Sequence, residues 1–205
     1  MTNKILLISL LVYLNCVGYH GAGIIPYAVN DGKLYFLLGI FSNGLSKDPK
    51  KFVSYYSSYF GGTKKPGDNE NPYFTASREA SEQLFFIFDP DIILEKWNKI
   101  TLKKTITFDT FYKKIKHLNT PKIDVDGFYI YFVPISYCDE IYTLFLYRDI
   151  YKNRDTDFPD HKLIVDLKWI PMEKLLDHLM SYKLTDLATQ IKNEKIFDKI
   201  NLGLQ

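Results

Sequence analysis

The sequence lacks the features that mark several large classes of protein. It has only two cysteines among 205 residues, and its four histidines show no spacing to one another or to cysteine that indicates a zinc site. The formal charge of +2 is too small to favour nucleic acid or an anionic membrane surface as a partner. We therefore expect neither a zinc protein nor a nucleic-acid-binding protein.

No linker rich in glycine, serine or proline divides the chain, and no internal repeat or low-complexity tract is present. One domain usually takes about 100 to 200 residues. Apolar residues make up 46% of the chain, and the 15 Phe and 16 Tyr add ample material for one core. We expect a single domain over residues 21–205.

Residues 1–18 resemble a secretory signal peptide. Lys4 precedes the apolar run Ile5 to Leu14, and the segment Cys16 to Gly18 offers small residues for cleavage. The run is too short for a comfortable membrane span, and cleavage would leave Cys138 without a partner for an intramolecular disulfide. We expect a secreted or periplasmic protein with no stable membrane span. The alternative is a cytoplasmic protein in which this segment packs on the domain.

The most informative part of the chain is the stretch from Gly61 to Gln83, which joins a glycine pair to an acidic helix. Asn71 is a good helix cap and Pro72 fits the first helical position. Apolar residues then recur at helical spacing, at Ala76, Ala80 and Leu84. The pattern predicts a helix that begins at Pro72, after a sharp turn at the glycines.

Two carboxylates share one face of this predicted helix. Glu79 and Glu82 are three residues apart, so they are neighbours on the helix surface and can converge on a hard cation such as Mg²⁺. The glycines allow the backbone to approach closely, so that the Gly61 carbonyl can add a further oxygen. A plainer interpretation also stands, because Arg78 and Glu82 are spaced as a surface ion pair that serves only solubility.

With these residues in place, the stretch resembles the box that defines the Nudix hydrolase family. The residues that match are Gly62, Arg78, Glu79, Ala80 and Glu82. Asp68 stands where the family has its first Glu, but nine residues rather than seven separate it from Arg78. Alternatively, Glu70 keeps the seven-residue spacing. Either alignment requires a two-residue insertion.

Two positions depart from the Nudix pattern. Gln83 replaces the second Glu of the terminal pair, and Phe85 occupies the place of the closing Gly. An amide offers a carbonyl oxygen but no charge, so affinity for a divalent cation should be lower.

The resemblance extends to both ends of the domain. The segments Gly23 to Val29 and Leu34 to Gly39 flank an Asn-Asp-Gly turn, which predicts a β-hairpin like the opening hairpin of a Nudix domain. The strand-like run Leu163 to Ile170 leads through Pro171 into a helix-like segment, as the family's late strand does. The resemblance implies an α/β fold, namely an α/β/α sandwich with a mixed β-sheet.

By this resemblance the protein is a metal-dependent pyrophosphohydrolase that cleaves the diphosphate linkage of a nucleoside diphosphate derivative, with Mg²⁺ or Mn²⁺ as cofactor. Glu79 and Glu82 would hold the metal with the Gly61 carbonyl and Gln83, while Arg78 would orient the acids. Gly62 with Asp68 or Glu70 would stabilise the loop. The general base stays open between Glu79 and an acid of the region from Asp139 to Asp160.

The basic residues Lys64 and Lys65 have two interpretations. They can attract substrate phosphates, or they can be part of a solvated loop face. A second function is also open, in which a weakened Nudix-fold module binds a nucleotide or a protein partner without turnover. Gln83 and Phe85 favour that alternative.

The middle of the chain predicts core elements. We expect helices over Asp91 to Lys99 and Phe108 to His117, and a strand over Phe128 to Ile135. Side chains alternate along the strand, so one set of residues around Tyr129 and Tyr131 either lines a pocket for a base or packs in the core.

Overall fold

The computed structural model describes residues 19–42, 55–84, 100–117, 120–139 and 164–203. The N-terminal signal-like segment, the predicted helix Asp91 to Lys99, Phe85 and the acids Glu140 to Asp160 lie outside the described residues. The strands are β1 Gly21–Asn30, β2 Lys33–Ser42, β3 Tyr55–Ser58, β4 Phe60–Thr63, β5 Lys122–Val125, β6 Phe128–Pro134 and β7 Ile164–Pro171. The helices are the 3₁₀-helix η1 Pro66–Asp68, α2 Pro72–Leu84, α3 Ile100–His117, α5 Met172–Ser181, α6 Thr185–Asn193 and α7 Ile196–Gly203.

All seven strands form one mixed sheet with β1 at its centre. β1 runs parallel to β6 and antiparallel to β2, and its first residues pair antiparallel with β4 on the side where β2 has diverged. β2 pairs with β3 and β7, and β5 closes the other edge beside β6. Eight of the ten residues of β1 are buried, as expected for a strand covered on both faces.

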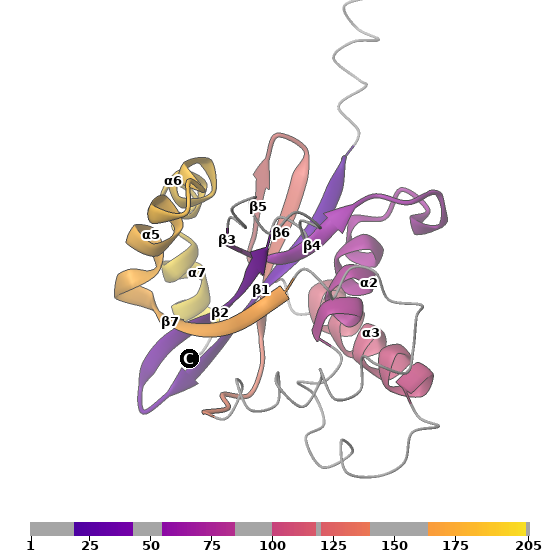
Figure 1. Ribbon diagram of the computed structural model, residues 1–205, viewed down its shortest axis with the longest axis horizontal. Coiled ribbons are helices and arrows are strands. Elements are labelled where there is room, and N and C mark those ends of the chain that lie inside the picture. The colour runs from indigo at the N-terminus through magenta and orange to yellow at the C-terminus, as the bar shows by residue number, and fades with distance from the viewer. Residues whose placement is uncertain (1–18, 43–54, 85–99, 118–119, 140–163, 204–205) are drawn as a thin grey trace, which may run out of the picture.

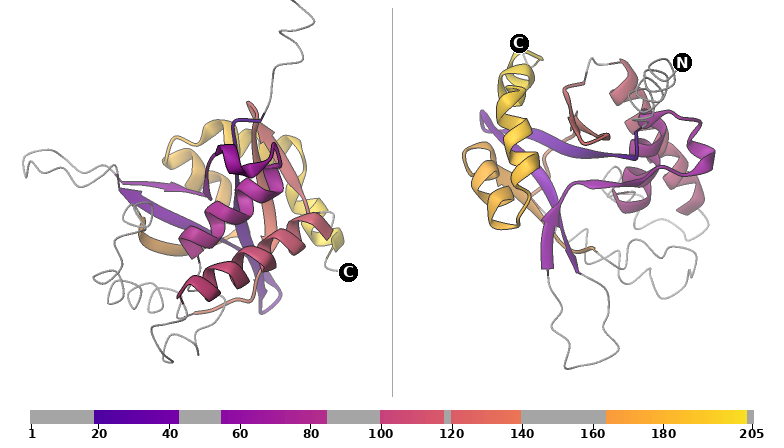
Figure 2. Two further views of the ribbon diagram at one scale, coloured as in Figure 1. Left: turned by 90° about the vertical axis from the view of Figure 1, so that its right-hand side faces the viewer. Right: turned by 90° about the horizontal axis from the view of Figure 1, so that it is seen from above.

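Helices cover both faces of the sheet, as Figures 1 and 2 show. One face packs against α2 and α3 through a core that includes Ile24, Phe60 and Phe111. The opposite face packs against α5, α6 and α7 around Phe36 and Phe132. The predicted α/β/α arrangement with a mixed sheet is therefore confirmed. Within the described residues, no helix is both long enough and apolar enough to cross a membrane.

Most of the predicted elements that lie in the described residues are confirmed. β1 and β2 form the hairpin, with Asn30 opposite Lys33 and positive φ angles of 48° and 71° at Asp31 and Gly32. The Asn71 side chain accepts a hydrogen bond from the Tyr73 amide at 3.0 Å, so it caps α2 as expected. α3 includes Phe108 to His117 and begins earlier, at Ile100.

The prediction of a sharp turn at the glycine pair was wrong. Gly61 and Gly62 lie in β4, opposite Gly23 and Ala22 of β1. A Cβ on Gly61 would lie 2.6 Å from the Gly23 Cα, so glycine is needed there because two backbones approach closely. The chain turns only after Thr63, in the loop that contains η1.

Candidate active site

α2 lies close to β4 because the residues between them are small. Ala76 and Ala80 are fully buried against the sheet, and this brings the acidic edge of the helix over the end of β4. A Cβ on Gly62 would lie 2.5 Å from the carboxylate of Glu79. Gly62 therefore provides the space that the Glu79 carboxylate occupies.

A buried ion pair connects the loop after β4 to α2. Asp68, only 1% exposed, accepts hydrogen bonds from Nε and Nη2 of Arg78, both at 2.9 Å. The Thr75 hydroxyl and the Lys65 backbone amide also donate to Asp68, at 2.6 and 2.9 Å. The guanidinium of Arg78 also donates hydrogen bonds from Nη1 to the Glu79 carboxylate and from Nη2 to the Thr63 carbonyl oxygen. The guanidinium is thus held from two sides.

The two candidates for loop stabilisation lie in different environments. Asp68 is buried against Arg78, whereas the side chain of Glu70 is 72% exposed and pairs with Lys64 at 2.6 Å. The Lys64 ammonium also lies 5.1 Å from the centre of the Tyr19 ring. The structure therefore places Glu70 and Lys64 in a surface pair beside the site, and Asp68 inside it.

The ionisation of these groups follows from burial and hydrogen bonding. Burial alone would raise the pKa of Asp68, but the hydrogen bonds from Arg78, Thr75 and Lys65 lower it to about 2. Burial raises the pKa of Glu79, because its contact with Arg78 offsets only part of the desolvation. Burial works against the charge of Arg78, yet hydrogen bonds to Asp68 and Glu79 raise its pKa.

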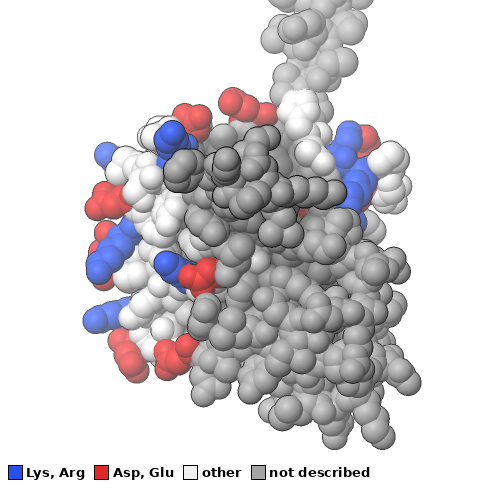
Figure 3. All heavy atoms as spheres, in the orientation of Figure 1, with Lys and Arg blue, Asp and Glu red and all other residues white. Residues whose placement is uncertain are grey.

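The second carboxylate, Glu82, lies beside the first. Its Oε2 is 3.8 Å from Nη1 of Arg78 and 3.9 Å from the Lys65 ammonium. The same ammonium is 4.0 Å from Oε1 of Glu79. Of the two predicted phosphate-binding lysines, Lys65 therefore lies at the carboxylates and Lys64 points to Glu70. Figure 3 shows charges of both signs together near this turn, at the upper right.

Gln83 contributes its amide to the same place. Nε2 lies 3.3 Å from the Gly61 carbonyl oxygen and 3.4 Å from Oε2 of Glu79, and donates to both. The residue is 5% exposed. Its Oε1 is buried and has no hydrogen-bond partner among the described residues.

The residues present fit a hard divalent cation. Within the described part of the chain no group of three His, Cys, Asp or Glu side chains is arranged so that it could hold a metal ion. The available set is instead two carboxylates, Glu79 and Glu82, with the Gly61 carbonyl. Oε1 of Gln83 joins them only if the amide turns over, because Nε2 faces Gly61 and Glu79 as it stands. All are oxygen donors, which Mg²⁺ and Mn²⁺ prefer, and Mg²⁺ usually keeps several waters as well.

Sequence reasoning did not find Thr75 and Tyr19 as parts of the site. The Tyr19 hydroxyl lies 3.1 Å from that of Thr75, which in turn donates to Asp68. A threonine inside a helix and a tyrosine before the first strand carry no pattern of their own. Of the proposed catalytic acids after β6, only Asp139 is described, and it is exposed.

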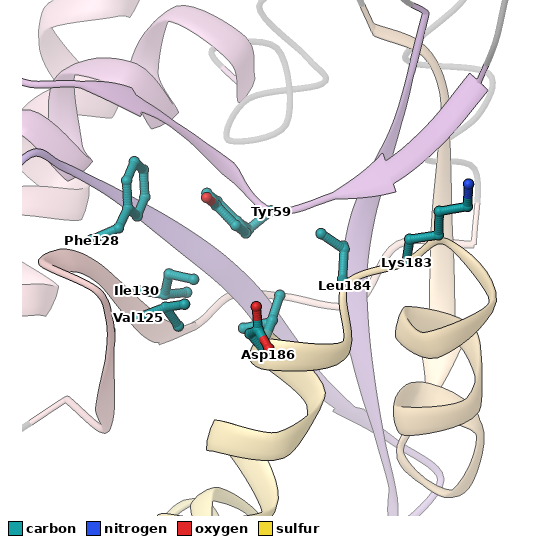
Figure 4. Close-up of a pocket in the computed structure, with 8 residues that line it drawn as sticks. Tyr59, Val125, Phe128, Ile130, Lys183, Leu184 and Asp186 are labelled. Atoms are coloured by element: carbon teal, nitrogen blue, oxygen red, sulfur yellow. The ribbon is translucent and has the colours of Figure 1, made fainter.

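A cavity of about 210 Å³ lies on the other face of the sheet. Figure 4 shows the side chains that surround it, which come from the residue between β3 and β4, from β5 and β6, and from the start of α6 with the two residues before it. Its lining residues are Tyr59, Val125, Phe128, Ile130, Lys183, Leu184, Asp186 and Leu187. The pocket is lined by the Phe128 and Ile130 side of β6, while Tyr131 is buried in the core under α2. The tyrosines of this strand therefore pack at the core, and the cavity is lined by residues of the opposite side.

The fold and site define an α/β protein with an acidic helix edge against a glycine strand. No known family matches the sequence, and no curated protein matches it. Among solved structures, a C. elegans Ap4A hydrolase in a binary complex is 14% identical, with a TM-score of 0.41, over 84% of this chain and 94% of that one. The NUDIX domain of Shewanella oneidensis NrtR, complexed with ADP ribose, is 16% identical, with a TM-score of 0.41, over 94% of this chain and 98% of that one.

The buried Asp68 predicts a pH dependence of stability. Its carboxyl stays ionised down to about pH 2 in the folded protein but takes up a proton near pH 3.8 when unfolded. The resulting stabilisation, about 2 kcal/mol, is therefore present above pH 5 and is lost as the pH falls toward 2. Asp68→Asn should lack this part of the acid sensitivity. Urea unfolding at pH 7 and pH 3 measures the loss of unfolding free energy in the wild type and in Asp68→Asn. An equal loss in the two proteins would contradict the lowered pKa of Asp68.

The contact between Gly62 and Glu79 predicts a steric effect. In Gly62→Ala the added methyl would meet the Glu79 carboxylate, so either the acid or β4 must shift. We expect Mn²⁺ to bind about tenfold more weakly, because small displacements of ligands have large effects. Electron paramagnetic resonance of free Mn²⁺ measures this. Gly67→Ala is the control, since its Cβ would meet nothing within 4 Å; equal binding by wild type and Gly62→Ala would speak against the site.

Proposed function

We propose that this protein is a divergent Nudix hydrolase that cleaves the diphosphate linkage of a nucleoside diphosphate derivative with Mg²⁺ or Mn²⁺. The observation that carries the proposal is the placement of Glu79. It is buried beside Glu82, rests on a glycine of β4 and is held by Arg78, which Asp68 locks in place. A surface pair that served solubility would need neither burial nor this support, because buried charge is costly.

The chain's own residues have distinct parts in this reaction. Glu79 and Glu82 would hold the cation with the Gly61 carbonyl and Oε1 of Gln83. When bound, such a cation neutralises phosphate oxygens and lowers the pKa of the attacking water. Arg78 fixes the direction of the Glu79 carboxylate, because its guanidinium cannot turn without breaking its bonds to Asp68.

Glu79 is also our candidate for the general base. Its burial raises its pKa above the usual value for a glutamate. A general base must lie within hydrogen-bond reach of the attacking water, and a carboxylate beside the cation would meet that requirement. Its fixed position beside Arg78 would then keep the accepting oxygen in one direction.

The cavity offers a place for the base of the nucleotide. Tyr59 and Phe128 line it with rings 5.2 Å apart at 48°, and Asp186 is also among the lining residues. At about 210 Å³ it is smaller than the site of a whole drug-sized ligand, so it suits one ring system of a larger substrate. Tyr59 precedes Gly61 by two residues, but the cavity and the carboxylates lie on opposite faces of the sheet, so the phosphates of a substrate held there would have to pass around β4.

A second function has an observation in its favour. The amide of Gln83 donates to two of the oxygens that a cation would need. A module that binds a nucleotide or a protein partner without turnover would have no use for that cation. The experiment below separates this function from hydrolysis.

Glu82→Gln should lower turnover about 100-fold or more, because it removes one charged ligand and leaves the shape of the side chain unchanged. We would follow hydrolysis of ADP-sugars, dinucleoside polyphosphates, coenzyme derivatives and nucleoside triphosphates in a phosphate-coupled assay, with Mg²⁺, Mn²⁺ or chelator. Glu194→Gln is the matched control, since Glu194 is exposed and pairs only with Lys199 among the described contacts. Ligand binding without turnover of any compound would favour the binding module.

Tyr59→Ala tests the cavity. Loss of a stacking surface should raise KM about tenfold with little change in kcat, because a base remote from the phosphate contributes equally to the ground and transition states. Tyr59→Phe keeps the ring and should behave like the wild type. A fall in kcat at unchanged KM would contradict this use of the cavity.

A further inference from the structure

The candidate metal site contains positively charged and donor groups of the chain itself. The Lys65 ammonium lies about equally far from the two carboxylates, 4.0 Å from Glu79 and 3.9 Å from Glu82. The Gln83 amide nitrogen lies between the Gly61 carbonyl and Glu79, at 3.3 and 3.4 Å. The oxygens that fit a cation are therefore already in contact with internal donors.

The side-chain amide of Gln83 is the second group at the site that can change its contacts. Its Oε1 is buried without a hydrogen-bond partner among the described residues. An amide has donors at one end and an acceptor at the other, so half a turn of the group would bring Oε1 toward the Gly61 carbonyl and the Glu79 carboxylate. Three oxygens facing one another repel unless a cation lies between them. The amide thus suits the site in two orientations, one without a cation and one with it.

Of the two cationic side chains at the carboxylates, only Lys65 is free to leave. The side chain of Arg78 is 15% exposed and is locked to Asp68. That of Lys65 is 51% exposed, and its ammonium approaches both acids at ion-pair distance without a direct hydrogen bond. Such contacts contribute little and are easily exchanged.

We propose that Lys65 is an internal counter-ion, which a divalent cation displaces when it binds to Glu79 and Glu82. The Gln83 amide turns in the same step and gives its Oε1 to the cation. This inference rests on the proposed function, which assigns the two acids to a metal. Lys65 then sets metal affinity by competition, and its role differs from that of a phosphate-binding lysine.

Mn²⁺ binding to the full chain tests the proposal without any substrate. We would titrate wild type, Lys65→Met and Lys64→Met, following free Mn²⁺ by electron paramagnetic resonance and the Tm with and without Mn²⁺. Lys65→Met should bind Mn²⁺ about five- to tenfold more tightly, because no ammonium competes. Lys64→Met is the matched control. It removes the same charge at the neighbouring position, where the lysine pairs with Glu70 and not with the two acids. It should bind within about twofold of wild type, since exposed charges this far off are screened.

A second readout separates competition from misfolding. Lys65→Met leaves the two carboxylates less well compensated, so its Tm without metal should fall by a few degrees and recover with Mn²⁺. Gln83→Glu should also bind Mn²⁺ more tightly than wild type, because it adds a charged ligand.

The possible outcomes distinguish a failure of the proposed role of Lys65 from a failure of the proposed hydrolase function. Equal or weaker Mn²⁺ binding by Lys65→Met, with tighter binding by Gln83→Glu, would overturn the role of Lys65 and leave the metal site standing. Equal tightening in Lys64→Met would overturn it too, as a general charge effect. Absence of Mn²⁺ binding in every variant would overturn both proposals. The predicted affinities without turnover of any nucleotide would support the counter-ion and overturn only the hydrolase.

Discussion

The ion pair between Asp68 and Arg78 is the interaction on which the site depends. It ties the loop after β4 to the helix that carries the acids, and it does so in a buried place where Asp68 has four hydrogen bonds. A buried pair of charges adds little net stability compared with apolar packing. Its effect here is geometrical, because a guanidinium fixed at one side directs its remaining nitrogen at Glu79.

The glycines of β4 determine how closely this strand approaches β1 and the Glu79 carboxylate. Gly61 lets β4 approach β1 at Gly23, and Gly62 leaves room for the Glu79 carboxylate. The small residues Ala76 and Ala80 bring α2 down onto that surface. The Glu79 carboxylate is therefore bounded on one side by the glycine backbone of β4 and on the other by Arg78, which Asp68 fixes. These two contacts restrict where the carboxylate can lie.

The sequence predicted the elements whose signals are local. The Asp31-Gly32 turn and the cap at Asn71 each depend on neighbouring residues, so their chemistry can be read directly from the order of the chain. The role of Gly61-Gly62 could not be read this way, because a glycine pair suits a turn and a close contact between strands equally well. The choice between Asp68 and Glu70, and between Lys64 and Lys65, also depends on contacts among β4, η1 and α2, which are distant enough in sequence to leave no periodic signal.

A glutamine at position 83 is compatible with a functional metal site. A third carboxylate beside Glu79 and Glu82 would raise the repulsion in the metal-free protein, whereas the neutral amide donates to Glu79 and to the Gly61 carbonyl. Compared with a glutamate, a glutamine at this position would therefore bind a cation less tightly but stabilise the protein in its absence. A chain without use for the cation would gain more by losing the buried Glu79 altogether, since an ionised group inside a protein is costly even when paired. The buried Glu79, with its full support from Arg78 and Asp68, therefore agrees with the proposed function at a weakly held metal.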